Sequence, residues 1–229
     1  MNSLPGPSNE RNRVGADVLA VTVLGAHPSP QTAAPGVTLR LRVEQLSGTR
    51  IYAAALRCQI QIAARTRRYA KDEQSRLYEL FGSVSQWDRT LRSVTWSQST
   101  VMVPSFDGRI DVDLAVPCTY DLQIASAKYL HAIRDGHVPL TLLFSGTVFQ
   151  LNGGGISIEP VPWDLEASYQ MPATIWHAAM DQFFPGGGWL IVRRDTIDRL
   201  QAFRGRHAVV TWDEAIDLLL QESAAEEPA

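Results

Sequence analysis

The stretch that decides the fold spans residues 117–149, PCTYDLQIASAKYLHAIRDGHVPLTLLFSGTVF. It holds two apolar segments on either side of a turn at Asp135-Gly136. The second segment, 140–150, has the continuous apolar character of a buried strand. The first segment mixes signals, because 120–125 begins as a strand and 127–133 fits either its continuation or a turn of helix. We expect the rest of the chain to pack around this stretch.

Alternating polar and apolar residues predict further strands on both sides. In chain order the expected strands are 18–24, 38–44, 51–63, 93–103, 109–116, 120–125, 140–150 and 156–161. A short turn joins 38–44 to 51–63, so these two are expected to form an antiparallel hairpin. Alternation within 93–103 places Trp96 and Met102 on one face. Asn152-Gly153 predicts a second hairpin, and Pro160 confines its return strand to a sheet edge.

Helical spacing appears in two parts of the chain. One helix is expected near 72–82, where it interrupts the strands and caps one end of the fold. After residue 171 the apolar period changes to that of helices, with faces built on Ile175, Trp176, Ile197, Leu200, Phe203, Trp212 and Ile216. Gly205 is expected to lie past the end of the second of these helices, and Thr211 with Glu214 forms a capping box for the third.

These elements predict a mainly β fold with added helices. We expect an antiparallel β-sandwich of about eight strands with an inserted helix, followed by a C-terminal helical segment. The expected division is a disordered tail over 1–15, the sandwich domain over 16–170, a helical segment over 171–221 packed on the sandwich, and an acidic tail over 222–229.

Composition and charge limit the functions to consider. The chain has 229 residues, of which 45% are hydrophobic and 20% charged, with a net charge of -3. A negative chain is not attracted to a polyanion, so we expect no nucleic-acid partner. The first residues lack the apolar run of a signal peptide, and no apolar run approaches the roughly 18 residues of a membrane helix. We therefore expect a cytoplasmic protein without a membrane span.

Motifs for common chemistries do not occur. The sequence has no GxxxxGK[ST], GxGxxG, HExxH, CxxC or GxSxG, which favours a non-enzymatic protein without a cofactor. His131 and His137 flank the Asp135-Gly136 turn, but nothing supplies further metal ligands, so no metal site is expected. Cys58 and Cys118 suit reduced thiols, and a disulfide between them stays an alternative because both lie in strand-like segments.

Polar residues suggest where a surface site would lie. Within and beside the central stretch the candidates are Cys118, Tyr120, Lys128 and His131. A basic run contributes Arg65, Arg67 and Arg68 as a docking patch for an acidic partner, the alternative being a solvated turn. Asp164 and Glu166 are spaced as paired acids, but they are interpreted as polar positions of a linker beside a packed Trp163.

A family resemblance rests on several strings. They are LRCQIQI (56–62), LYELFG (77–82), MVPSFDG (102–108), VPCTYDL (116–122), AKYLHAIRDGHVPLTLLFSGTVF (127–149), VPWDLEASYQMP (161–172) and FPGGGWLIVRRDTIDRL (184–200). Over residues 18–221 the chain resembles a bacterial family of unknown function whose genes are met near those of high-affinity nickel–iron hydrogenases. The resemblance implies an accessory protein for that system and no known catalytic residues.

Three functions follow as hypotheses. The first is a non-catalytic accessory or interaction protein that assists assembly or stabilisation of a nickel–iron hydrogenase, with Trp163, Trp176 and Trp212 as interface anchors. The second is a small-molecule-binding module or enzyme with a pocket between the sandwich and the helices. The third is a homodimeric structural protein.

Overall fold

A computed structural model describes residues 18–30, 34–119, 121, 124–187 and 190–226 of the chain. The chain divides into two compact units, Met1–Trp189 and Leu190–Ala229. The first unit holds the strands and the second holds the last two helices. The predicted fold class, mainly β with α, is confirmed.

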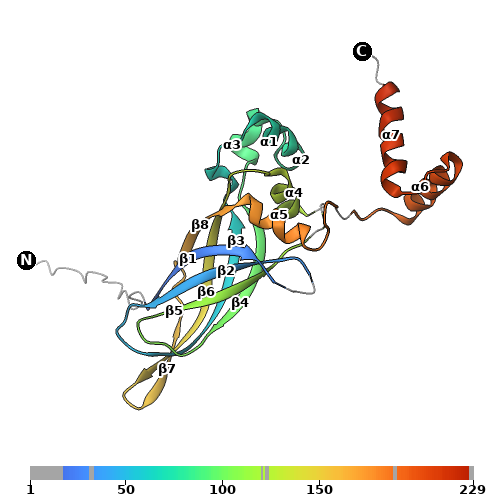
Figure 1. Cartoon of the computed structure of the whole chain (residues 1–229). Helices are drawn as coiled ribbons and strands as arrows, with labels where there is room; N and C mark the ends of the chain where they lie inside the picture. Colours follow the sequence, from blue (N-terminus) through green and yellow to red (C-terminus); the bar gives the residue numbers. More distant parts are fainter. Residues whose placement is uncertain (1–17, 31–33, 120, 122–123, 188–189, 227–229) are drawn as a thin grey trace, which may run out of the picture. The chain divides into compact units, whose positions relative to one another are not determined.

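The strands form two antiparallel sheets (Figure 1). Sheet A has the order β1-β2-β5, built from β1 (Leu19–Pro28), β2 (Gly36–Gln45) and β5 (Arg109–Pro117). Sheet B has the order β4-β3-β6-β7, with β8 also paired to β6, and is built from β4 (Val94–Val103), β3 (Ile51–Ile62), β6 (His137–Asn152), β7 (Gly155–Pro160) and β8 (Glu166–Pro172).

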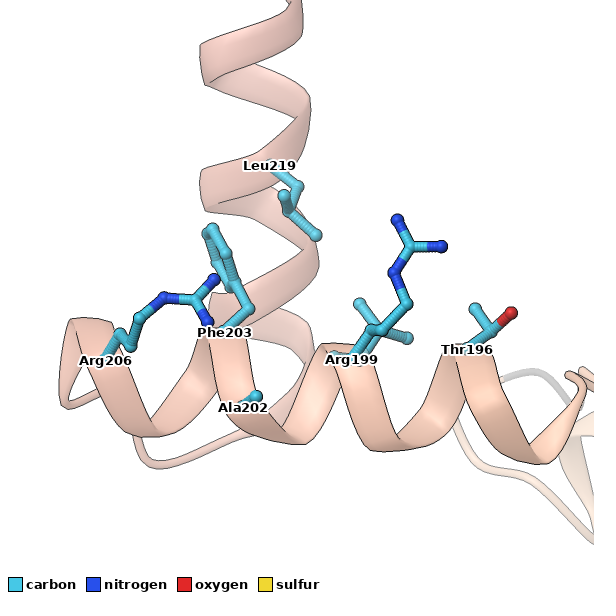
Figure 2. Close-up of a pocket in the computed structure, with 7 residues that line it drawn as sticks. Thr196, Arg199, Ala202, Phe203, Arg206 and Leu219 are labelled. Carbon is cyan, nitrogen blue, oxygen red and sulfur yellow. The ribbon is translucent and has the colours of Figure 1, made fainter.

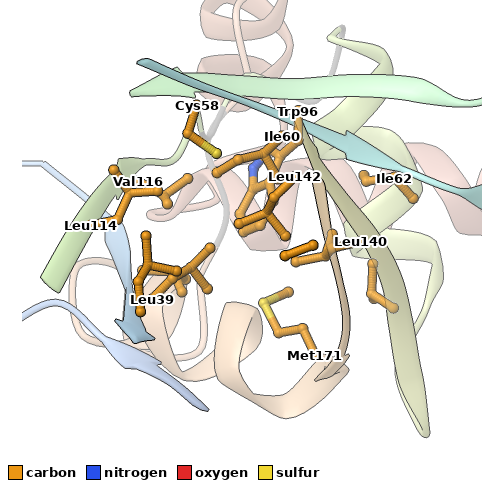
Figure 3. Close-up of a cluster of buried hydrophobic side chains, with 14 of the residues drawn as sticks. Leu39, Cys58, Ile60, Ile62, Trp96, Leu114, Val116, Leu140, Leu142 and Met171 are labelled. Carbon is orange, nitrogen blue, oxygen red and sulfur yellow. The ribbon is translucent and has the colours of Figure 1, made fainter. Parts of the chain in front are cut away.

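The alternating apolar residues of both sheets meet in one core. Figure 3 shows Leu39 and Leu114 of sheet A on the side of the core opposite Cys58 and Ile60 of sheet B. All four side chains are fully buried. Burial of a side chain of this size stabilises the fold by about 1.5–3 kcal/mol, so this shared core is what holds the two sheets together.

The hairpin predicted between the second and third strands is wrong. β2 pairs with β1 and β5, whereas β3 pairs with β4 and β6, so the connection between them crosses from one sheet to the other. Alternation reveals that each strand has one buried face, but it does not reveal which strand lies beside it.

A β-bulge corrects the predicted face of β4. The register with β3 shifts between Ile60 and Gln61, so one extra residue of β4 is accommodated there. Trp96 is buried, whereas Met102, predicted to share its face, lies on the outer face and is 63% exposed. An extra residue reverses the orientation of every position after it, which strict alternation cannot anticipate.

Strand β6 is the longest strand and organises sheet B. One edge of it bonds to β3, while the other edge bonds to β8 along 137–143 and to β7 along 147–152. At the junction, Val161 N donates to Gly146 O and Phe144 N donates to Leu165 O. The predicted edge position of 156–161 is confirmed, because β7 ends the strand order. The interpretation of 163–169 as a linker is wrong, since β8 occupies most of it.

Short helices gather at one end of the sandwich (Figure 1). They are η1 (Ala64–Thr66), α1 (Lys71–Arg76), α2 (Tyr78–Phe81), η2 (Val84–Gln86), α3 (Trp87–Thr90), α4 (Ala125–Ala132) and α5 (Ala173–Asp181). The helix expected near 72–82 is divided at Leu77, whose side chain is fully buried. The segment 127–133 is helical in α4 up to Ala132, and the strand expected over 120–125 is wrong at its described positions 121, 124 and 125.

Helix α5 belongs to the first unit and packs against β1 and β2. Its apolar face follows the predicted period, with Trp176 and Ala179 buried. The packing of the later helices on the sandwich stays a prediction.

The second unit contains α6 (Arg194–His207) and α7 (Trp212–Glu226). Helix α6 continues through Gly205 and ends before Ala208, which takes a left-handed conformation with φ 52°. The expectation that Gly205 lies past the helix end is therefore wrong. The predicted capping box is confirmed: Glu214 N donates to Thr211 Oγ1 over 3.2 Å, and Thr211 N donates to Glu214 Oε2 over 3.0 Å.

No helix among the described residues is both long and apolar enough to cross a membrane.

Candidate functional site

Two of the three arginines of the predicted basic docking patch make contacts within the protein. Arg65 donates to the carbonyl oxygens of Leu91 and Asp88, which fastens η1 to the end of the α3 segment. Arg67 is turned inward to an ion pair with Glu73, at 2.8 Å. Arg68 is exposed. The three charges therefore do not form one free cationic surface, and the sequence could not distinguish a solvated run from one used internally.

Arg67 and Glu73 connect distant parts of the helical end. Their side chains are 14% and 8% exposed, so the pair is shielded from solvent. Arg67 Nη2 also donates to Asp135 O at the central turn, while Glu73 Oε2 accepts from Ala70 N. The guanidinium lies 5.2 Å from the centre of the Tyr69 ring, at a cation–π distance. These contacts connect α1, the segment before it and the central turn, so the pair has a structural role and is a joint of the fold in this sense.

The candidate Cys118 is buried, with 6% of its surface exposed. Its thiol donates weakly to Val116 O at 3.8 Å, and burial raises the pKa of Cys118 to about 12. Burial likewise raises the pKa of Cys58 to about 12. Both cysteines are free, so the alternative of a disulfide is not realised. A thiol held protonated and out of solvent is a poor nucleophile, so neither residue provides a reactive site.

The other predicted surface residues separate from one another. Tyr120 lies outside the described residues. Lys128 on α4 forms an exposed ion pair with Glu79 on α2, which ties these helices together. His131 is exposed on α4 and faces a different neighbour, helix α5. Of the predicted set, His131 lines a hollow.

That hollow is a shallow groove of about 500 Å³ along α4 and α5. It is lined by His131, Arg134, Thr174, His177, Ala178 and Asp181. His177 was not predicted as a site residue, although its place one turn after Ala173 on an amphipathic helix could have suggested it. The groove thus combines two imidazoles, a guanidinium and a carboxylate along a largely apolar lining.

The two imidazoles differ in environment. Desolvation, with the nearby positive charges of His177, Arg134 and Arg76, lowers the pKa of His131. His177 Nε2 donates to Ile133 O at 2.8 Å, because a carbonyl oxygen can only accept. This bond fixes the ring orientation of His177 at the groove wall.

A metal centre is not formed by these residues. Among the residues that the structure describes, no group of three or more His, Cys, Asp or Glu side chains is arranged to hold a metal ion. The spacing of His131 and His137 around the central turn does not produce one.

The paired acids Asp164 and Glu166 line a second hollow, of about 270 Å³, beside Leu19 and Leu46. Both carboxylates lie on the surface with Leu165 between them. Trp163, which was interpreted as packed, is 94% exposed. Neither carboxylate lies in an enclosed pocket with a second catalytic group, so acid–base catalysis has no support here.

The outer face of sheet B carries an apolar surface that the sequence interpretation missed. The register places Ile158 opposite Phe149 and Phe149 opposite Ala53, in one row across three strands. The next row pairs Ile156 with Leu151. We call these residues, together with Ala55 and Met102 on the neighbouring strands, the sheet B patch. Its two isoleucines are 51% and 67% exposed.

The shape of the sheet B patch favours contact with another surface. Small side chains at Ala53 and Ala55 on β3 lie between Phe149 of β6 and Met102 of β4 on this face. The β6–β7 hairpin extends at the end of the sandwich away from the helices (Figure 1). Exposed Trp163 follows β7 along the same edge of β6. Contiguous exposed apolar residues of this kind are typical of interaction surfaces. Alternation of Leu151, Ile156 and Ile158 is visible in the sequence, but alternation alone does not reveal which face of a strand is buried.

The arrangement defines a two-layer antiparallel β-sandwich with helices closing one end and an apolar outer sheet face. The chain belongs to a family of unknown function, DUF6084, whose model matches residues 16–228. No curated protein matches the chain. The solved structure of a selenomethionine-labelled beta-glucosidase from Kluyveromyces marxianus is similar at 7% identity, with a TM-score of 0.25 over 67% of this chain. The match spans 15% of that enzyme's chain, and a similarity this low carries no argument about fold or function.

Proposed function

We propose that the protein is a non-catalytic accessory protein that binds another protein through the sheet B patch. The observation that supports this is the apolar outer face of sheet B, where exposed Ile158 lies in one row with half-buried Phe149 and Ala53 across three hydrogen-bonded strands. Hydrogen bonding between the strands holds this row rigid. A preformed apolar surface binds a partner without the entropic cost of ordering it. Trp163 beside it is the kind of side chain that anchors interfaces.

The proposed partner is a component of a nickel–iron hydrogenase, and the proposed role is its assembly or stabilisation. Support for this choice comes from the sequence strings that resemble a family met near hydrogenase genes, above all the long string over 127–149. A binding protein without catalytic residues suits such a role, because holding a subunit in a competent state requires a surface rather than an active site.

Native co-purification tests the proposal. The tagged chain is expressed in its own host, and the bound proteins are identified by mass spectrometry with metal analysis of the same sample. We expect the wild type to recover a hydrogenase subunit. The double variant Ile156→Ser/Ile158→Ser should lose it, because the most exposed part of the sheet B patch on β7 becomes polar while β7 keeps its backbone pairing.

A matched control changes equally exposed apolar residues elsewhere in the same unit. Tyr78→Ser/Val84→Ser removes exposed side chains at the helical end and should leave recovery unchanged. Absence of any hydrogenase subunit from the wild-type sample would refute the partner. Equal recovery by the Ile156→Ser/Ile158→Ser variant would refute the surface.

A second candidate function is the binding of a small anionic ligand in the groove between α4 and α5. Arg134, His131 and His177 supply its positive and hydrogen-bonding groups. The imidazole NMR signals of the two groove histidines, followed during titration with inorganic phosphate, test this. Shifts of these signals that saturate, with those of His27 unmoved, support binding; parallel shifts of all three contradict it.

A further inference from the structure

The C-terminal pair of helices has little core of its own. Within residues 190–223, the buried hydrophobic side chains are Phe203 and Ala215. Arg204 covers the Trp212 ring at 4.4 Å, and Phe203 stacks on His207 at 4.2 Å between ring centres. A unit of roughly 40 residues does not ordinarily bury enough surface to be stable without a further partner.

Both helices expose their apolar stripes. On α6 the stripe includes Ile197 and Leu200, and on α7 it includes Ile216, Leu219 and Leu220. Leu220 is 63% exposed and Ile216 is 41% exposed. The spacing is that of helices which pack in bundles, where such stripes face other helices.

A groove of about 360 Å³ lies between these stripes. Figure 2 shows Phe203 of α6 and Leu219 of α7 at its apolar floor, with Arg206 and Arg199 on α6 to either side. Its occupant should therefore be an apolar helix face with acidic residues along its border.

Helix α7 itself has this character. Its sequence, WDEAIDLLLQESAAE, carries five acidic residues and no Lys or Arg. Helix α6 carries four arginines against two aspartates. Among the described residues of the unit, the ion pair present joins Arg193 to the nearby Asp195, so it does not connect α6 to α7. Acidic side chains of α7 and arginines of α6 are therefore available for ion pairs with another molecule.

We infer that the C-terminal helical pair binds the same pair of a second copy of this chain. In a two-fold arrangement, α7 of each copy lies against α6 of the other, so one interface is made twice. The apolar stripes then form the core of a four-helix bundle, with acidic residues of α7 beside arginines of α6. This inference uses a surface separate from the sheet B patch and does not depend on the proposed hydrogenase partner.

Sedimentation velocity of the full chain tests the inference. The wild type should dimerise with rising concentration, and the dimer should weaken in high salt because border charges are screened. Arg199→Glu/Arg206→Glu and Asp217→Arg/Glu222→Arg should each be monomeric at concentrations where the wild type is dimeric. An equal mixture of the two variants should recover the dimer, since each acidic face then meets a basic one.

Arg89→Glu/Arg92→Glu is the matched control, because it makes the same change of net charge on the sandwich unit and should leave the dimer intact. Circular dichroism of each variant establishes that its helices are folded. A wild type that stays monomeric up to hundreds of micromolar would overturn the inference. So would a mixture of the two folded variants that stays monomeric, and a dimer that both charge reversals leave unchanged.

Discussion

The phenolic oxygens of Tyr69 and Tyr129 lie 2.7 Å apart, and the direction of their hydrogen bond is determined. Tyr69 Oη also lies 2.6 Å from Ala64 O, which can only accept. The single proton of Tyr69 therefore goes to that carbonyl, and Tyr129 donates to Tyr69. Tyr129 is fully buried, and burial raises its pKa far above the ordinary value, so it remains a donor.

This order predicts unequal effects of removing the two hydroxyls. Tyr69→Phe leaves both the Tyr129 hydroxyl and Ala64 O without this partner and should cost about 2–4 kcal/mol, whereas Tyr129→Phe should cost about 1 kcal/mol. Urea unfolding of the two variants measures the difference. Equal losses of unfolding free energy would contradict the assigned direction.

Two adjacent carboxylates on α1 should respond very differently to neutralisation. Glu73→Gln leaves the charge of Arg67 unpaired in a shielded place and should lower the free energy of unfolding by about 3 kcal/mol. Asp72→Asn removes an exposed pair with Arg76, which solvent screens, and should leave the free energy of unfolding close to that of the wild type. Chemical denaturation checks both. A Glu73→Gln protein as stable as Asp72→Asn would show that the Arg67 pair is not a joint of the fold.

Gly146 should tolerate no side chain. Its φ is +141°, and a Cβ there would lie 2.0 Å from Ala55 O. Gly146→Ala combines backbone strain of about 1–3 kcal/mol with overpacking of similar size, and should unfold the protein or shift its melting temperature steeply downward. Gly25→Ala is the matched control, because a Cβ there meets nothing within 4 Å. Thermal unfolding measures both melting temperatures. Equal melting temperatures for the two variants would contradict this account.

The Arg42–Asp111 pair on sheet A predicts a specific pH dependence. The hydrogen bond and charge of Arg42 hold the pKa of Asp111 below its usual value. A carboxylate whose pKa is lowered by folding contributes stability that is fully present above the unfolded pKa of about 3.9 and is lost as the pH falls through the folded value. The stability difference between wild type and Asp111→Asn should therefore be largest near neutral pH and shrink in acid. Urea unfolding at several pH values measures this difference in unfolding free energy. A difference that stays constant with pH would show that the Arg42–Asp111 pair is not its cause.

Local patterns predicted the β elements well because burial on one face imposes alternation directly. Leu39, Leu41 and Val43 on β2 are fully buried, as their spacing indicates. The same spacing does not identify the neighbouring strand. The hairpin of β2 and β3 was therefore predicted wrongly from the short turn between them. It also gave no sign of the bulge on β4 that turns Met102 outward.

The candidate site was harder to predict than the fold because it depends on distant contacts. Arg67 meets Glu73 nearby in sequence, but its second acceptor is Asp135 O. His131 and His177, on different helices, line one groove. Neither of these long-range contacts produces a local sequence pattern. The sheet B patch could be predicted only if β3 and β7 were known to pair with opposite edges of β6. Strand pairing of this kind leaves no mark in the local sequence.

The shared use of β6 has a consequence for how the chain is made. β3 ends at Ile62, whereas β6, on which β3, β7 and β8 all depend, begins only at His137. During synthesis, the backbone groups along one edge of β3 have no strand partner until β6 is made. Such non-local pairing is slow, and the waiting edge invites pairing with other chains. The nascent protein is therefore most vulnerable to aggregation between the emergence of β3 and that of β6.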